Sequence, residues 1–439
     1  MPTQLEIYSR HARYYAKVAI KVQMNYERVS DKFLAELTQL DTNWTNIQKG
    51  QAWAAANVDN NNEAAKWCAA FGFLDWEVLT RHLHPKECID WIKAGIKAAK
   101  QLNASTLIAP LLGNLGQVYS ALREIPRAIE LYKQRLELAR QASDNQGEGT
   151  ALCNLGIAYA AQSQFHEAIK CYEQALVISR RFRLLHNEGW LLGNLGGAYS
   201  ALGEHTRAIT IYEKRLKIAI NLRDQQGELR ALGELGSAYT NIGEYRRAVE
   251  YLDKALALAR QYRFARDERR ILGSLGNVFT ALHEYDRAIT CFEETIRFAK
   301  DSGDRRDEAI ALGNLGIIFA AENRFTDAIK FYDESLILNR ELGDRLGEAV
   351  TLENLANAYL ATDKADQAQK HYEEALTIVR SIGAQEDESH IMHNLGLLHA
   401  ILGNYSKATD LWQSAIAIAE RIGAKHLLER IRADLIQIR

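Results

Sequence analysis

The chain has 439 residues, with 47% hydrophobic residues, 25% charged residues and a formal net charge of −2. This balance excludes an intrinsically disordered chain and a globally basic nucleic-acid-binding protein. Only 4 prolines occur, and because proline interrupts helix interiors, this scarcity favours long helices.

The cysteine pattern and the N-terminal composition indicate a cytoplasmic protein. No CxxC pair occurs, so we expect reduced thiols rather than a disulfide framework. Charged residues interrupt positions 1–20, which therefore lack the apolar core of a signal peptide. No run of about 18 uncharged apolar residues exists, so no membrane span is expected.

Residues 1–60 form the first predicted segment, an N-terminal helical segment with helices near 4–27 and 31–57. Its aromatic residues are Tyr8, Tyr14, Tyr15, Tyr26, Trp44 and Trp53. Residues 61–103 are predicted to be a degenerate capping hairpin of two helices. Its first helix runs near 64–80 with Trp67, Phe71 and Leu74 on the core face, and its second contains 91–96.

From residue 104 to residue 423 the chain repeats eight times with a 40-residue period. The string Leu-x-x-Leu-Gly begins at Leu112, Leu152, Leu192, Leu232, Leu272 and Leu312, with looser copies at Leu352 and Met392. An aromatic follows in seven copies, and the eighth has His399. Spacings of i, i+3, i+4 and i+7 place these residues on one face of a helix, called helix A.

A turn column and a second amphipathic helix, helix B, complete each repeat. The turn column is Arg123, Ser163, Gly203, Gly243, His283, Asn323, Asp363 and Gly403. Gly, Asn and Asp favour the left-handed conformation that ends many helices. Helix B carries an invariant alanine and, four residues later, a large residue: Tyr132, Tyr172, Tyr212, Leu252, Phe292, Tyr332, Tyr372 and Trp412. Residues 424–439 are predicted to form a C-terminal capping helix.

Charged residues recur at both ends of the predicted helices. A cation ends most B helices, and a glutamate opens the next helix A at 148, 188, 228, 268, 308, 348 and 388. Both arrangements complement the helix dipole, at about 0.3–1 kcal/mol each, so the glutamates need no catalytic explanation.

These motifs resemble the tetratricopeptide repeat, in the 40-residue form of kinesin light chains and spindle-orientation adaptors. The resemblance implies an all-α, right-handed superhelical solenoid of antiparallel helix pairs with a concave groove. Residues 37–53 are similar to the segment that joins the ATPase module to the repeat tail in bacterial STAND (NB-ARC-like) signalling proteins. The Gly-x-x-x-x-Gly-Lys-Ser/Thr loop of those ATPases is absent from the sequence.

A polar column lies just before the second leucine of each helix A. Its members are Asn114, Asn154, Asn194, Glu234, Ser274, Asn314, Asn354 and Asn394. Asparagine is a poor helix former, and its amide both donates and accepts hydrogen bonds. A row of asparagines therefore suits an exposed peptide-binding surface, and similar adaptors hold peptides with asparagines at this position. Alternatively, the asparagines bridge adjacent A helices or are inherited consensus.

Trp190, Arg230 and Arg270 occupy one column four residues earlier, in three consecutive repeats. An aromatic anchor beside two guanidinium groups would suit an acidic or aromatic-bearing segment. The alternative is an intrahelical Arg230–Glu234 pair, which is equally compatible with the sequence.

Two further clusters receive mainly structural interpretations. Arginines stand at 260, 263, 266, 269 and 270, and two repeats earlier at 180, 181 and 183, and they could meet an acidic partner or nucleic acid. Asp267 and Glu268 interrupt the first group, which favours dipole complementation and a solvated surface instead. His390 and His393 could form a metal pair, but no further ligand stands at a known spacing.

The sequence therefore predicts a non-enzymatic scaffold or adaptor that binds a protein or peptide segment in its groove. No cofactor, metal, nucleic acid or membrane partner is expected, and an acidic segment is one candidate ligand. The alternative is a sensor or regulatory arm of a STAND-type ATPase system that lacks its own nucleotide-binding module.

Overall fold

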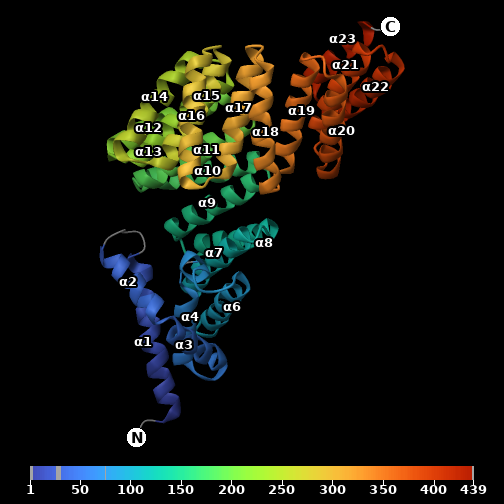
Figure 1. Cartoon of the computed structure of the whole chain (residues 1–439). Coiled ribbons are helices and arrows are strands. Elements are labelled where there is room, and N and C mark those ends of the chain that lie inside the picture. Colours follow the sequence, from blue (N-terminus) through green and yellow to red (C-terminus); the bar gives the residue numbers. More distant parts are fainter. Residues whose placement is uncertain (1–2, 26–30, 75, 438–439) are drawn as a thin grey trace. The chain divides into compact units, whose positions relative to one another are not determined.

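The computed structural model describes residues 3–25, 31–74 and 76–437, and its secondary structure in these ranges is helical without a β-strand. The chain divides into two compact units, residues 1–231 and 232–439. The order of the helices along the chain is seen in Figure 1. The prediction of an all-α fold is confirmed.

The N-terminal segment contains α1 (Gln4–Asn25), α2 (Asp31–Thr42), α3 (Trp44–Ala56) and a 3₁₀ turn, Val58–Asn60. The predicted single helix over 31–57 is wrong, because Asn43 separates α2 from α3. Asn43 is not helical, and its Nδ2 donates to the Gln39 carbonyl oxygen at 2.7 Å, which satisfies an end of α2. The part of the predicted first helix at 26–27, with Tyr26, lies outside the described residues.

The next helices are α4 (Asn62–Gly72), α5 (Trp76–Thr80) and α6 (Pro85–Gln101). The predicted helix over 64–80 is thus two helices. α4 packs on α6 at Gly72, where an added Cβ would lie 3.2 Å from the Gly95 Cα. The His84 ring and the Glu87 carboxylate form a capping box at the start of α6.

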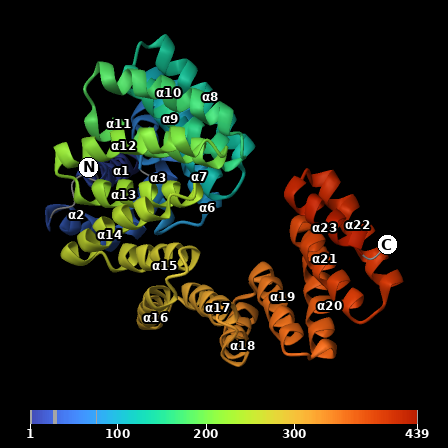
Figure 2. The same cartoon turned by 90° about the horizontal axis from the view of Figure 1, so that it is seen from above.

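Eight helix pairs follow. The A helices are α7 (Ser105–Ala121), α9 (Asn145–Ala161), α11 (Leu185–Ala201), α13 (Gln225–Asn241), α15 (Ala265–Ala281), α17 (Arg305–Ala321), α19 (Arg345–Ala361) and α21 (Gln385–Ile401). The B helices are α8 (Ile125–Gln141), α10 (Phe165–Arg181), α12 (His205–Leu222), α14 (Tyr245–Tyr262), α16 (Tyr285–Ser302), α18 (Phe325–Leu342), α20 (Ala365–Ile382) and α22 (Tyr405–Ile422). The last helix, α23 (Lys425–Gln437), packs on α22; Figure 2 shows both at the C-terminal end.

Two turns in each repeat use left-handed residues. Every member of the predicted turn column has a positive φ, between 58° at His283 and 77° at Gly203 and Gly403. The turn between repeats is also left-handed, which the sequence analysis missed, with Arg183 at 54° and Arg263 at 57°. These two arginines of the predicted basic clusters are therefore turn residues.

The large helix-B residue lies directly on the small residue of helix A. An added Cβ at Gly276 would come 2.6 Å from Phe292 Cζ, and one at Gly236 would come 2.5 Å from Leu252 Cγ. The glycine thus leaves room for a ring or branched side chain that is almost completely buried. This explains why the glycine column and the large-residue column recur together.

The two recurrent charge columns pair with each other. Arg140 Nε lies 2.7 Å from Glu148 Oε1, and the equivalent distance from Arg340 to Glu348 is 2.8 Å. The A helices that follow start three residues earlier than predicted, at Asn145 and Arg345. The glutamates therefore lie within the first turn and reach back to the preceding helix B instead of opening helix A.

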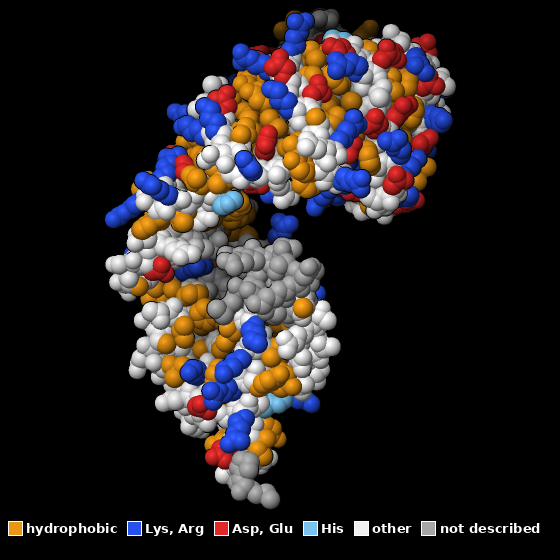
Figure 3. Space-filling view, turned by 90° about the vertical axis from the view of Figure 1, so that its left-hand side faces the viewer, with side chains coloured by type: hydrophobic (Ala, Val, Ile, Leu, Met, Phe, Trp, Pro, Cys, Tyr) orange, Lys and Arg blue, Asp and Glu red, His pale blue; other side chains and the backbone are white. Residues whose placement is uncertain are grey.

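Within the described residues, no helix is both long and apolar enough to span a membrane. The face of the molecule in Figure 3 carries both basic and acidic side chains. The boundaries proposed for the four segments of the chain stay predictions.

Candidate functional site

Consecutive A helices lie side by side within each unit. In the first unit α7 contacts α9, and α9 contacts α11; in the second, α15, α17, α19 and α21 contact one another in order. The polar column and the Trp190/Arg230/Arg270 column lie on these helices. Three clefts open between successive A helices of the first unit.

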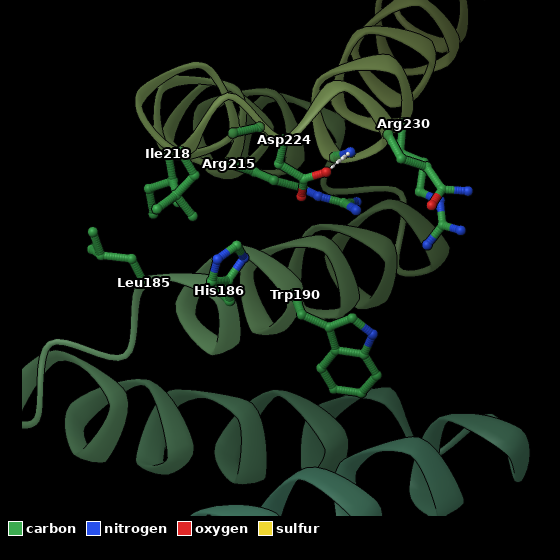
Figure 4. Close-up of a pocket in the computed structure, with 12 residues that line it drawn as sticks. Leu185, His186, Trp190, Arg215, Ile218, Asp224 and Arg230 are labelled. Atoms are coloured by element: carbon green, nitrogen blue, oxygen red, sulfur yellow. Dashed lines mark hydrogen bonds between the residues drawn. The ribbon is translucent and has the colours of Figure 1, made fainter. Parts of the chain in front are cut away.

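The first of these, the arginine cleft, lies between α11 and the start of α13, with α12 as its floor. It has a volume of about 150 Å³, and its lining includes Leu185, His186, Trp190, Arg215, Asp224 and Arg230. In Figure 4, His186, Arg215 and Asp224 face the same opening. The Trp190 indole points away from α11 on the side of that helix opposite His186. Two of the predicted site residues, Trp190 and Arg230, are therefore brought to one cleft.

The guanidinium groups of this cleft differ in their surroundings. Arg215 is only 7% exposed and passes beneath Gly193, whose missing Cβ leaves room for it. Asp224 accepts a hydrogen bond from the Gly227 backbone N–H at 2.9 Å, which caps α13. Arg230 is exposed and makes no hydrogen bond or ion pair with any residue that the structure describes. Arg230 is therefore the basic group available to an incoming anion.

Trp190 also lines a second cleft, between α9 and α11. This leucine cleft has a volume of about 230 Å³, and its walls include Gly149, Ile178, Leu184, Trp190 and Leu191. The Trp190 side chain is 42% exposed and that of Leu184 is 38% exposed. An exposed indole between two clefts is suited to anchor a ligand.

The third cleft, the isoleucine cleft, lies between α7 and α9. It has a volume of about 310 Å³ and is lined by Trp76, Gln117, Ser120, Ala121, Tyr132, Asn154 and Ile157. The Asn154 Nδ2 atom is buried and has no hydrogen-bond partner. Sequence reasoning missed Trp76 and Ile157, because neither stands in a column of uniform residue type.

The second unit also has a cleft that predicted site residues line. It lies between α15 and α17, has a volume of about 210 Å³, and includes Arg270, Gly273, Ser274, Ile310 and Asn314 in its lining. Arg270 Nη2 is 3.5 Å from Asp267 Oδ1 in the first turn of the same helix.

The side chains of the polar column make two kinds of hydrogen bond. Nδ2 of Asn114, Asn314 and Asn394 bridges to a neighbouring element, reaching the Leu74 carbonyl oxygen, Asn277 Oδ1 and Glu353 Oε1 at 3.2, 3.2 and 2.7 Å. Asn194 Nδ2 and Ser274 Oγ donate to carbonyl oxygens of their own helices. Glu234 and Asn354 are half-buried.

The expectation that this column is exposed is wrong. Its members are half-buried, and Asn394 is buried. The amides that bridge reach residues 37 to 41 positions earlier in the chain. For Asn114, Asn314 and Asn394 the geometry favours the bridging role. Asn154 and Asn194, which make no bridge between helices, stay candidates for ligand contact.

The other polar clusters serve packing. Arg260 pairs with Glu268 and Glu294, and the 10%-exposed Arg269 side chain pairs with Asp304 and Asp307. His390 Nδ1 is 2.7 Å from Glu353 Oε1, whereas His393 Nε2 is 2.7 Å from Asp434 Oδ2, so the two histidines face different partners.

No cluster of three or more His, Cys, Asp or Glu side chains suited to a metal occurs among the described residues. The five cysteines are free thiols. Burial raises the pKa of Cys153, beside the leucine cleft, to about 12, which keeps the thiol protonated.

The tetratricopeptide repeat model matches overlapping windows that together span residues 102–381, and a second such model matches residues 389–422. The chain belongs to the tetratricopeptide repeat family. The resemblance seen in the sequence is thereby confirmed, and the fold is that of a protein-interaction scaffold. A search of curated proteins found no match.

Several solved structures share the fold. A STAND protein with a tetratricopeptide repeat sensor from Pyrococcus horikoshii is 14% identical, with a TM-score of 0.60 over 98% of this chain and 68% of that chain. The apo quorum sensor NprR from B. thuringiensis is 16% identical, with a TM-score of 0.54 over 80% of this chain and 97% of that chain. A Rap protein complexed with competence and sporulation factor is 14% identical, with a TM-score of 0.50 over 83% and 99%.

Proposed function

We propose that the protein is a non-enzymatic scaffold that binds an extended peptide or protein segment along its A helices. The observation that carries the proposal is that the half-exposed Trp190 lines two clefts, one of which also has the unpaired Arg230 in its lining. An aromatic anchor next to an available guanidinium group is a typical centre of a binding surface. A quorum sensor and a Rap protein complexed with competence and sporulation factor, both of the same fold, support this proposal.

The charge of the arginine cleft favours an acidic ligand group. The exposed Arg230 contributes a positive charge that makes no hydrogen bond or ion pair with any described residue. Because a guanidinium group binds a carboxylate through paired N–H donors, an aspartate, a glutamate or a terminal carboxylate would suit the cleft. Asn154 and Asn194 would add contacts to the ligand backbone.

Titration of the full chain with peptides selected from a random phage-displayed library tests the proposal. Trp190→Ala combined with Arg230→Gln should weaken binding by at least tenfold. Val177→Ser combined with Arg246→Gln is the matched control, because both side chains are exposed on B helices. Equal binding by the parent and the Trp190/Arg230 variant, with loss in the control variant, would show that the outer surface binds instead.

A second candidate function is the sensor arm of a STAND-type ATPase system. The support for it is the similarity to the Pyrococcus horikoshii STAND protein over 98% of this chain. A sensor arm should change the ATP hydrolysis rate of a partner that co-purifies with it from the native cell. A co-purified partner without ATPase activity would remove this candidate and leave the scaffold.

A further inference from the structure

An apolar cavity lies in the first unit, between α1, α4 and α7 and apart from the clefts of the repeats. The cavity has a volume of about 390 Å³, which exceeds the volume of each cleft described above, and it shares no described lining residue with those clefts. α1 and α4 contact each other and lie side by side near the N-terminus (Figure 1). The described lining residues are Ile20, Lys66, Trp67, Ala70, Phe73, Leu74 and Leu107.

This lining is apolar apart from one cation. All of the described lining residues are hydrophobic except Lys66. Apolar cavities take up apolar molecules instead of water, because their walls offer water too few hydrogen-bond partners. Ligand sites in proteins are commonly cavities of about 300–1,000 Å³ that are mostly apolar and carry a few polar groups. The cavity therefore suits a ligand with a large hydrocarbon part and a small polar head.

Two hydrogen-bond donors of the lining lack an acceptor. Lys66 is exposed, its Nζ lies 5.4 Å from the centroid of the Trp67 ring, and it makes no hydrogen bond or ion pair with a described residue. The Glu63 carboxylate, one turn earlier on α4, accepts a hydrogen bond from Ser9 Oγ at 2.7 Å. The Trp67 indole N–H is buried and has no partner among the described residues. A carboxylate has two acceptor oxygens, so it can accept from both an ammonium group and an indole N–H.

Further positive charge lies beside the cavity on α1. Arg13, Lys17 and Ile20 are spaced i, i+4 and i+7, so they share one face of this helix with a residue that lines the cavity. Arg13 and Lys17 are exposed and make no hydrogen bond or ion pair within the described part of the chain. α1 has four lysine and arginine residues and one acidic residue, Glu6. The local charge therefore favours an anionic head over a neutral or cationic one.

We propose that this cavity binds a long-chain carboxylate of the fatty-acid type. The hydrocarbon chain lies among the apolar lining residues, and the carboxylate lies at Lys66 and Trp67. The proposal goes beyond the peptide-binding function and does not depend on it, because the cavity and the clefts share no described lining residue. A phospholipid also combines acyl chains with an anionic head, so vesicles form a separate arm of the test.

Isothermal titration of the full chain with laurate, below the concentration at which laurate forms micelles, tests the site. Laurate should bind, and dodecyltrimethylammonium, which has the same chain and a cationic head, should bind at least tenfold more weakly. Decanoate, which is two methylene groups shorter, should bind about tenfold more weakly than laurate, because less hydrocarbon leaves water. Vesicles of phosphatidylglycerol should not retain the protein in a sedimentation assay.

Three variants locate the head and the chain of the ligand. Lys66→Gln should weaken laurate binding at least tenfold and leave the affinity for the neutral dodecanol within twofold. Lys93→Gln is the matched control, because Lys93 is also exposed in the first unit but lies on α6 outside the described lining. Ala70→Leu places a larger side chain at the cavity wall and should weaken laurate and dodecanol alike. Thermal melting shows whether each variant is folded, and the comparison of decanoate with laurate tests the chain without any substitution.

Each outcome supports or overturns this site. Equal affinity for laurate and dodecyltrimethylammonium, parent-like laurate binding by Lys66→Gln, or equal loss in Lys93→Gln would overturn the carboxylate site. An affinity that does not change with chain length would overturn the placement of the chain in the cavity. Binding to vesicles without binding of laurate would assign these residues to a lipid surface instead. Lys66→Gln should leave peptide binding at Trp190 and Arg230 unchanged, so this inference and the proposed function can fail separately.

Discussion

Gly236 lies under Leu252 so closely that an added Cβ would come 2.5 Å from Leu252 Cγ. Leu252 is only 1% exposed, so its side chain cannot move aside without disturbing buried neighbours. The same relationship joins Gly276 to Phe292 and Gly316 to Tyr332. In these repeats the helix-A glycine provides the space that the large helix-B side chain fills, so the two residues pack as a matched pair.

Gly236→Leu should lower the free energy of unfolding by about 1–3 kcal/mol, because the contact becomes overpacked. Adding Leu252→Ala to that variant should recover part of the loss. Gly273→Ala is the control, since the added Cβ meets no neighbour and alanine is the better helix former. Urea denaturation measures all three; an unchanged midpoint for Gly236→Leu would refute the packing assignment.

The Arg340–Glu348 pair should contribute a coupling energy of about 0.5–1 kcal/mol. The Glu348 side chain is only 6% exposed, but that of Arg340 is 47% exposed, so solvent screens the pair. A double-mutant cycle of Arg340→Ala and Glu348→Ala measures the coupling energy, which should fall as salt is added. A coupling energy of zero at low salt would show that this recurrent ion pair does not stabilise the fold.

Buried histidines should make the second unit sensitive to acid. Burial lowers the pKa of His371, His393 and His399 below the ordinary value of about 6.5. A histidine with a lowered pKa stays neutral in the folded state at a pH at which the unfolded chain already binds a proton there. The stability of the folded state is therefore fully present above about pH 6.5 and is lost as the pH falls through the lowered pKa. His390 acts oppositely, because its hydrogen bond with Glu353 raises its pKa. Its contribution is present below about pH 6.5 and is lost as the pH rises through the raised pKa.

His399→Phe should therefore raise Tm and reduce the fall in Tm between pH 7.5 and pH 5.5. His399 is 2% exposed, and both of its ring nitrogens are buried without a hydrogen-bond partner. Phenylalanine restores the aromatic residue that the other seven repeats have in this column. His426→Phe is the control, because the His426 side chain is exposed. His82 would not serve as a control, because it pairs with Asp41. A parent-like pH profile in His399→Phe would contradict the assignment.

Asn154→Ala combined with Asn194→Ala should weaken peptide binding by roughly one to two decades, since each lost hydrogen bond to a neutral group costs about 0.5–1.5 kcal/mol. Stability should change little, because neither side chain bridges two helices. Asn394→Ala should instead lower the stability and leave the affinity for the peptide unchanged, because the buried Asn394 amide donates a hydrogen bond to Glu353. Isothermal titration with a selected peptide, alongside thermal melting, distinguishes the two; loss of stability without loss of affinity at Asn154 and Asn194 would assign them to packing.

The sequence predicts most of the fold because the repeat is an internal alignment. The 40-residue period determines the helix pairs, and the φ angles of His283 and Asp363 follow from their turn column. The break at Asn43 was not predictable in this way, because residues 1–60 have no second copy for comparison. The early start of α9 was missed because Asp144, which caps it, stands outside the recurrent columns used to place the helix.

The candidate site was less accessible from the sequence. Trp190 and Arg230 stand 40 residues apart in one column and line one cleft, because residues at that separation lie on neighbouring A helices. The burial of Asn394 and the bridge from Asn314 to Asn277 depend on how closely those helices pack, which the period does not specify. The contribution of Trp76 arises from α5, which departs from the repeat pattern.

Site-specific photo-crosslinking in the native cell tests most directly whether the A helices form the binding surface. A benzophenone amino acid replaces Ile157, Trp190 or Val177 in three separate variants. Ile157 and Trp190 line clefts between A helices. Val177 is 66% exposed and lies on α10, a B helix. Adducts at the first two positions, mapped by mass spectrometry to one extended segment of one partner and missing at Val177, are the predicted result. Adducts formed at Val177 alone would contradict the account.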